Sequence, residues 1–163
     1  MNSVPVLYTQ RCVLDGITKE DVPVLRCIID DEQFRRFLPE LFGFVRNSAG
    51  LHRFLDTFSK YLAEDEGYLW GIRKENQLVG FVALMDLSIC PSIFYAMHPD
   101  FRNQGYGKES VAEAVDYFKT TSTLLELQTV VYKDNEASLS ILKSCGFRKS
   151  AEIHNKFVMT LCS

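Results

Sequence analysis

The chain has 163 residues, which is enough for one domain with its own hydrophobic core and short for two. Hydrophobic residues make up 47% of the chain and charged residues 24%, a balance that excludes a disordered or a fibrous protein. Eighteen basic against 21 acidic residues give a net charge of -3, which leaves no basic surface for a nucleic-acid backbone. We therefore expect a single globular domain over residues 1–163 and no nucleic acid as a partner.

The start of the chain and its cysteines favour a cytoplasmic protein. Residues 1–5 lack the basic region and apolar run of a secretory signal, and no stretch reaches the roughly 18 apolar residues of a membrane span. The five cysteines form no C-x-x-C pair, and an odd number cannot all pair within one chain. We expect reduced thiols and no membrane contact, and we leave monomer and homodimer both open.

The first third of the chain predicts a short strand and two helices. Residues 11–15 are typical of a strand. Thr18 followed by Asp21 is a helix-start signature, so a helix should run to about residue 29. Apolar residues recur every three or four positions over residues 48–63, which predicts a helix with one apolar stripe that packs on a sheet.

Three strands should follow. Residues 68–73 and 78–87 are β-rich runs, and the polar residues 74–77 between them suit a hairpin turn. Residues 92–97 predict a third strand, which Pro99 stops because proline lacks the amide that would continue the ladder.

The last third alternates helices and strands. After a glycine-rich loop and a helix, residues 126–132 predict a strand. Asn135 is placed to cap a short helix that Gly146 ends, and a final hairpin spans about 147–161. The whole order predicts an α/β (α+β) fold, in which a mixed sheet carries helices on both faces.

Residues 102–108, with the sequence Arg-Asn-Gln-Gly-Tyr-Gly-Lys, form the loop before the predicted central helix. Gly105 and Gly107 let backbone amides approach an anion, and the positive end of the helix adds attraction, so the loop suits a pyrophosphate. A Walker loop would need glycine five residues before Gly-Lys and Ser or Thr after it, but the chain has arginine and glutamate there. A dinucleotide fingerprint would need glycine or alanine where Ser110 stands. Taken alone, the loop could also be a turn that merely starts a helix.

The motifs around the loop carry a resemblance. Residues 95–99 (Tyr-Ala-Met-His-Pro) precede it, and residues 135–138 (Asn-Glu-Ala-Ser) and 145–147 (Cys-Gly-Phe) follow it. This combination resembles the GNAT N-acetyltransferase superfamily, and the opening Thr9-x-Arg11-x-x-Leu14 is similar to its RimJ/RimL-like branch, which includes ribosomal-protein N-terminal acetyltransferases. The resemblance covers about residues 9–161. It implies a mostly antiparallel, twisted GNAT-like sheet of about six to seven strands.

The resemblance also implies where acetyl-coenzyme A binds. Met97 and His98 match the end of the family strand beside which the pantetheine arm lies. Asn135 matches the asparagine that contacts the pantetheine side, although a helix cap would also explain an asparagine there. The family's pyrophosphate contacts are loop amides, which here belong to Arg102, Asn103, Gln104, Gly105, Tyr106, Gly107 and Lys108.

The resemblance gives candidates for two catalytic roles, an acid and a base. Many family members carry a tyrosine seven residues after the asparagine, which protonates the leaving thiolate, but position 142 here is Leu. Ser138 matches the serine that replaces it in the RimJ/RimL-like branch, although serine is also common in the first turn of a helix. The family strand that often supplies a base has no carboxylate here. Glu152 or His154 in the final hairpin could reach the cleft, although each is also explained as a solvated turn residue.

The implied reaction is direct attack of a neutral amine on acetyl-coenzyme A in a ternary complex, without a metal. At pH 7 about a tenth of an α-amino group is neutral, against about 0.04% of a lysine side chain. A site without a strong base therefore favours a peptide N terminus or a small primary amine, with lysine third. The alternatives are a non-catalytic acyl-coenzyme A-binding module, which keeps the loop without acid or base, and a fold relic that binds nothing.

Overall fold

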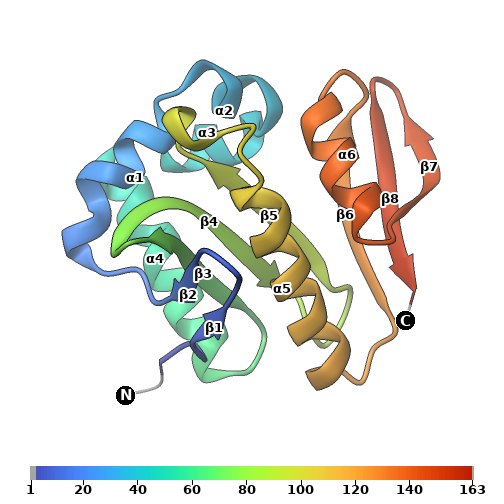
Figure 1. Cartoon of the computed structure of the whole chain (residues 1–163), viewed down its shortest axis with the longest axis horizontal. Helices are drawn as coiled ribbons and strands as arrows, with labels where there is room; N and C mark the ends of the chain where they lie inside the picture. Colours follow the sequence, from blue (N-terminus) through green and yellow to red (C-terminus); the bar gives the residue numbers. More distant parts are fainter. Residues whose placement is uncertain (1–2, 163) are drawn as a thin grey trace.

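The computed structural model of the chain describes residues 3–162 and contains one eight-stranded sheet (Figure 1). Residues 1, 2 and 163, at the ends of the predicted domain, lie outside the described part. The strand order is β1-β2-β3-β4-β5-β6-β8-β7, and every neighbouring pair is antiparallel except β5 and β6. The predicted mixed, mostly antiparallel sheet is confirmed. The strands are β1 (Leu7–Tyr8), β2 (Val13–Asp15), β3 (Tyr68–Lys74), β4 (Gln77–Met85), β5 (Ser92–Met97), β6 (Glu126–Tyr132), β7 (Arg148–Ile153) and β8 (Lys156–Cys162).

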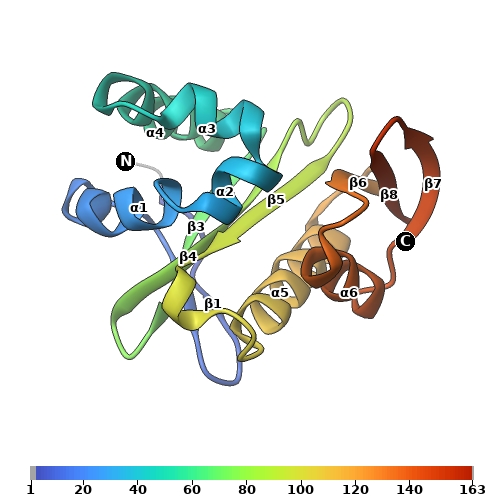
Figure 2. The same ribbon diagram turned by 90° about the horizontal axis from the view of Figure 1, so that it is seen from above.

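Helices cover both faces of the sheet, as expected. In Figure 2, α1 to α4 lie on one side of β3, β4 and β5, and α5 and α6 lie on the other. None of the helices within residues 3–162 is long and apolar enough to cross a membrane. The helices are α1 (Val22–Ile29), α2 (Glu32–Phe37), α3 (Pro39–Val45), α4 (Ser48–Ala63), α5 (Tyr106–Thr121) and α6 (Glu136–Ser144), with short 3-10 turns at Lys19–Asp21 and Pro99–Phe101.

The two faces bury separate hydrophobic clusters because side chains alternate along a strand. On β4, Val82 packs in the cluster with Phe118 of α5, whereas the adjacent Phe81 packs in the cluster with Phe54 of α4. The sheet therefore lies between the two clusters. The apolar stripe predicted for residues 48–63 therefore packs on the sheet as expected.

Two segments differ from the sequence-based prediction. The predicted strand at 11–15 is shorter, and a two-residue strand, β1, pairs with it across a turn in which the amide of Thr9 donates to the carbonyl of Cys12. This strand raises the count to eight. Residues 30–47 carry no pattern that predicts a helix or strand, but they form α2 and α3, which begin at the Asp31 cap and at Pro39.

Strands β5 and β6 pair only briefly, and this positions the site. β4 and β5 pair over six residues, from Met85 with Ser92 to Gly80 with Met97. In contrast, the only β5–β6 pair within residues 3–162 joins Ser92 to Gln128. β6 pairs with β8 along its whole length and follows that strand away from β5 (Figure 1). The sheet is therefore open between β5 and β6.

Candidate active site

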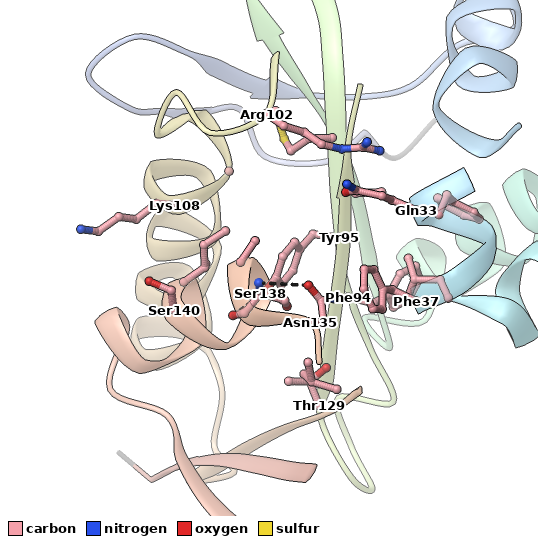
Figure 3. A pocket seen from close by; sticks show the side chains of 18 of the residues that line it. Gln33, Phe37, Phe94, Tyr95, Arg102, Lys108, Thr129, Asn135, Ser138 and Ser140 are labelled. Atoms are coloured by element: carbon pink, nitrogen blue, oxygen red, sulfur yellow. Dashed lines mark hydrogen bonds between the residues drawn. The ribbon is translucent and has the colours of Figure 1, made fainter. Parts of the chain in front are cut away.

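A cleft of about 390 Å³ occupies the opening between β5 and β6 (Figure 3). Residues 94–97 of β5 and 129–131 of β6 form its two sheet walls. The glycine-rich loop before α5, helix α2 and the start of α6 complete the lining. One opening thus brings together segments separated by about a hundred positions in the chain.

The exposed edge of β5 presents free backbone groups to this cleft. The amide of His98 donates to the carbonyl of Val79 on β4, at 2.7 Å. Because hydrogen-bonded and free pairs alternate in an antiparallel ladder, Tyr95 and Met97 direct their amides and carbonyls away from β4, toward β6. An extended ligand arm could bind to this edge as an added strand would.

Two glycines shape the loop end of the cleft. Gly105 has φ 88°, and a Cβ atom there would lie 2.7 Å from the guanidinium of Arg11. A Cβ at Gly107 would lie 3.4 Å from Met97 and 3.5 Å from Ile141, both of which line the cleft. A side chain at position 107 would therefore occupy the cleft, next to the amides at the start of α5.

Eight of the predicted site residues line the cleft. They are Met97, Arg102, Asn103, Gly105, Gly107, Lys108, Asn135 and Ser138.

Four of the predicted site residues do not line it. Gln104 donates its side-chain amide to the carbonyl of Asp100, and the Tyr106 ring is buried, with the Arg11 guanidinium 4.2 Å from its centre. His98 uses its backbone amide on β4, and its ring accepts from the amide of Asp100. The fourth residue, Glu152, lies on β7.

Glu152 belongs to a surface ion-pair cluster. Its carboxylate accepts from Lys149 at 2.8 Å and from Lys133 at 2.9 Å, and these bonds lower the pKa of Glu152 to about 2. Such a carboxylate is a weak base. His154 follows in the exposed turn between β7 and β8 and is also outside the lining. The structure does not bring either residue together with Ser138.

The sequence analysis missed Tyr95, whose hydroxyl lies 2.6 Å from the hydroxyl of Ser138. Ser138 is held from its other side, because its amide donates to the side-chain oxygen of Asn135 at 3.3 Å. Burial raises the pKa of Tyr95, so the phenol stays protonated at neutral pH. Leu142, at the family's tyrosine position, is fully buried in the core. Side chains alternate between the two faces of β5, so the sequence already placed Tyr95 on the opposite face from Phe94, the face that α6 covers.

The N-terminal Thr9-x-Arg11 motif has a structural explanation in Glu109. The Thr9 hydroxyl and the Arg11 amide donate to one carboxylate oxygen at 2.6 and 3.0 Å, and the Arg11 side chain donates to the other at 2.9 Å. Burial alone would raise the pKa of Glu109, but these bonds outweigh it and lower the pKa. Because Glu109 lies in the first turn of α5, the motif fixes the helix start that carries the loop.

A second ion pair joins the glycine-rich loop to the start of α2. Asp31 caps α2 by accepting from the amides of Gln33 and Phe34, and its carboxylate also binds the guanidinium of Arg102 in the loop. Burial opposes ionisation of Asp31, but Arg102 and the helix amides keep its pKa below the usual value. The side chain of Arg102 is therefore engaged by α2, which leaves its backbone for a ligand.

Within residues 3–162, no carboxylate lines the cleft, and no three His, Cys, Asp or Glu side chains gather closely enough to hold a metal ion. The cleft offers amides, hydroxyls and aromatic surface.

Comparisons with known proteins agree with this geometry. The model of the acetyltransferase (GNAT) domain family matches residues 11–148. The uncharacterized N-acetyltransferase YoaA of Bacillus subtilis is 28% identical over 151 residues, which cover 89% of this chain and 84% of that protein. The N-alpha-acetyltransferase RimI of Mycobacterium tuberculosis is 28% identical over 98 residues, or 57% of this chain and 60% of that protein. The solved structure of RimL, a ribosomal L7/L12 alpha-N-protein acetyltransferase in complex with coenzyme A, has a TM-score of 0.82 at 14% identity, covering 97% of this chain and 98% of that one.

Proposed function

Because the chain belongs to the GNAT acetyltransferase family, we propose that it transfers the acetyl group of acetyl-coenzyme A to a primary amine, either a peptide N terminus or a small molecule. One observation carries this proposal: a single cleft joins the glycine-rich loop, the open edge of β5 and the Ser138 hydroxyl. The similarity to RimI, an N-alpha-acetyltransferase, and to RimL, a ribosomal L7/L12 alpha-N-protein acetyltransferase, supports a peptide acceptor.

The cleft suits coenzyme A in shape and chemistry. About 390 Å³ is within the usual range of roughly 300 to 1,000 Å³ for a small-molecule site. Loop amides from residues 102–108 at the start of α5 would hold the pyrophosphate, and the free edge at Tyr95 and Met97 would hold the pantetheine arm. Asn135 adds a polar side chain nearby, although its oxygen already caps α6.

Ser138 and Tyr95 supply the proton in this proposal. Bound acetyl-coenzyme A provides a thioester carbonyl; the amine nitrogen bonds to its carbon, and the carbon–sulfur bond breaks. Ser138 donates its hydroxyl proton to the departing sulfur and takes one back from Tyr95, whose hydroxyl orients the serine. Tyr95 regains its proton from the water that accepts the proton of the amine. The backbone amides at the β5 edge polarise the carbonyl.

The described lining has no carboxylate base, so the amine must arrive neutral and lose its proton to water. This condition favours an α-amino group, with pKa about 7.7 to 8.0, over a lysine side chain. The ion pairs of Glu152 with Lys133 and Lys149 leave it outside the proposed catalytic set.

A non-catalytic acyl-coenzyme A-binding module is the second candidate, and the missing base favours it. The two are separated by incubating the protein with acetyl-coenzyme A and a panel of amines while measuring free thiol and acetylated product. We expect thiol and product in equal amounts. Tight coenzyme binding without thiol release from any amine would instead identify a binding module, and failure of coenzyme A to raise the melting temperature would identify a fold relic.

A further inference from the structure

The part of the cleft between α2 and β5 is lined mainly by apolar side chains. Phe37 of α2 and Phe94 of β5 contribute aromatic rings, and Leu38 lies beside them. Figure 3 shows Phe37 and Phe94 next to each other, with Gln33 above and Thr129 on the strand across from them. Gln33 and Thr129 are uncharged polar groups in this part of the cleft.

No carboxylate of the described residues lines this part of the cleft. Among the described residues that line the cleft, only Arg102 and Lys108 carry charge, and the guanidinium of Arg102 is paired with Asp31 at the start of α2. The acids on the surrounding elements lie outside the lining; of these, Asp134 binds Arg36 and Glu40 binds Lys156.

This distribution of apolar and charged side chains should favour some acceptor amines over others. A second ammonium group on an acceptor would lose water in the cleft and find no carboxylate there, and an unpaired charge is costly to desolvate. An apolar body would instead cover Phe37 and Phe94 and remove their surface from water. Gln33 and Thr129 can each form a hydrogen bond with a neutral amide or hydroxyl of the acceptor.

We propose, on the basis of the transferase function proposed above, that the acceptor is a primary amine carried on an uncharged, apolar body. Two sources share this chemistry: a peptide whose first side chain is apolar, and an alkyl or aryl amine. Polyamines, and peptides that begin with a charged residue, are poor acceptors.

Matched acceptors test this selectivity. One tetrapeptide is made with N-terminal norleucine, lysine or glutamate, because lysine is norleucine with one added ammonium group. Hexylamine and 1,6-diaminohexane form the same comparison for small molecules. We expect kcat/KM to be about tenfold or more higher for the norleucine peptide than for the lysine and glutamate peptides, and higher for hexylamine than for the diamine. The more active arm identifies the source.

Two variants test whether Phe37 and Gln33 cause the preference for an uncharged, apolar acceptor, and a third is their control. Phe37→Ala should lower kcat/KM for norleucine severalfold while leaving the lysine peptide nearly unchanged. Gln33→Glu places a carboxylate on the exposed rim and should raise the lysine-to-norleucine ratio. Phe44→Ala is the control, because Phe44 is an exposed aromatic residue of α3 outside the cleft. Coenzyme A affinity and melting temperature should stay close to the parent values in all three variants.

The outcomes separate this inference from the proposed function. Thiol release that is as fast or faster with the lysine or glutamate peptide, or with the diamine, would overturn the acceptor class and leave the transferase function intact. An unchanged preference in both folded Phe37→Ala and Gln33→Glu would also overturn it. Absence of thiol release with every amine would overturn both proposals.

Discussion

The hydroxyl groups of Tyr95 and Ser138 lie 2.6 Å apart and join the open strand β5 to the first turn of α6. Each sits at a wall of the cleft that would hold the thioester. The contact gives Ser138 a fixed orientation that a serine in the first turn of a helix would otherwise lack.

Replacing Ser138 with alanine should lower kcat about tenfold to a hundredfold, because a positioned proton donor contributes roughly 10² to 10⁴ and a thiolate leaves fairly well unaided. Coenzyme A affinity should hardly change, since the interaction is made in the transition state. Steady-state kinetics and calorimetry measure the two quantities. Ser144→Ala, on the same helix outside the cleft, is the control. A kcat within about twofold of the parent would return Ser138 to the role of an ordinary helix serine.

Tyr95→Phe keeps the ring and removes the hydroxyl that orients Ser138. We expect kcat to fall about threefold to tenfold, the size of one hydrogen bond. The same change in the Ser138→Ala background should have little further effect, because Tyr95 acts through the Ser138 hydroxyl, which that variant lacks. A double-mutant cycle on kcat measures this coupling. Independent, multiplying losses would show that Tyr95 acts on the substrate directly.

Gly107→Glu should abolish acetyl-coenzyme A binding in a folded protein. The new Cβ would make only ordinary contacts, at 3.4 Å or more, so the fold can accept it, but the carboxylate would enter the cleft beside the proposed pyrophosphate amides. Calorimetry measures the affinity and circular dichroism the fold. Gly43→Glu adds the same charge at an exposed site on α3, with no atom within 4 Å of its Cβ, and should bind normally. Unchanged affinity in folded Gly107→Glu would contradict the loop assignment.

Local patterns predicted much of the fold. The helix at 48–63 and the strands at 92–97 and 126–132 match the observed elements, because a long apolar period or a β-rich run bounded by breakers determines them locally. Residues 30–47 gave no such period, since two short helices of six and seven residues are too brief to show one. Their boundaries depend instead on the Asp31 cap and Pro39.

The site was less predictable, because side-chain contacts join residues far apart in the chain. The glycine-rich loop was visible as a run of seven residues, but Tyr95 and Ser138 are 43 positions apart. The place of Glu152 in the final hairpin suggests a base but does not reveal its two lysine partners. The sequence motif was therefore enough to identify the glycine-rich loop. The contact of Tyr95 with Ser138 can be recognised only from the three-dimensional arrangement of β5 and α6.

A buried ion pair outside the cleft makes stability depend on pH. Arg73 of β3 donates to both carboxylate oxygens of Asp21 at 2.9 Å, and both side chains are largely shielded from solvent. The hydrogen bonds from Arg73 lower the pKa of Asp21 against the opposing effect of burial. A carboxyl group with a lowered folded-state pKa stabilises the fold above its unfolded pKa of about 3.9 and loses that contribution as the pH falls through its folded value.

Asp21→Asn should therefore lower the free energy of unfolding by about 1 to 3 kcal/mol at pH 7, because it removes the negative charge and one of the two oxygens that accept from Arg73. The difference from the parent should stay constant from pH 7 to about 5 and shrink below about pH 4, where the unfolded parent binds a proton that its folded state resists. Urea titrations across this range measure both quantities. Asp56→Asn, the same charge change at an exposed position of α4, should cost little at any pH. If the loss at Asp21 persisted undiminished at pH 3, it would arise from packing, and the ion pair would not be its cause.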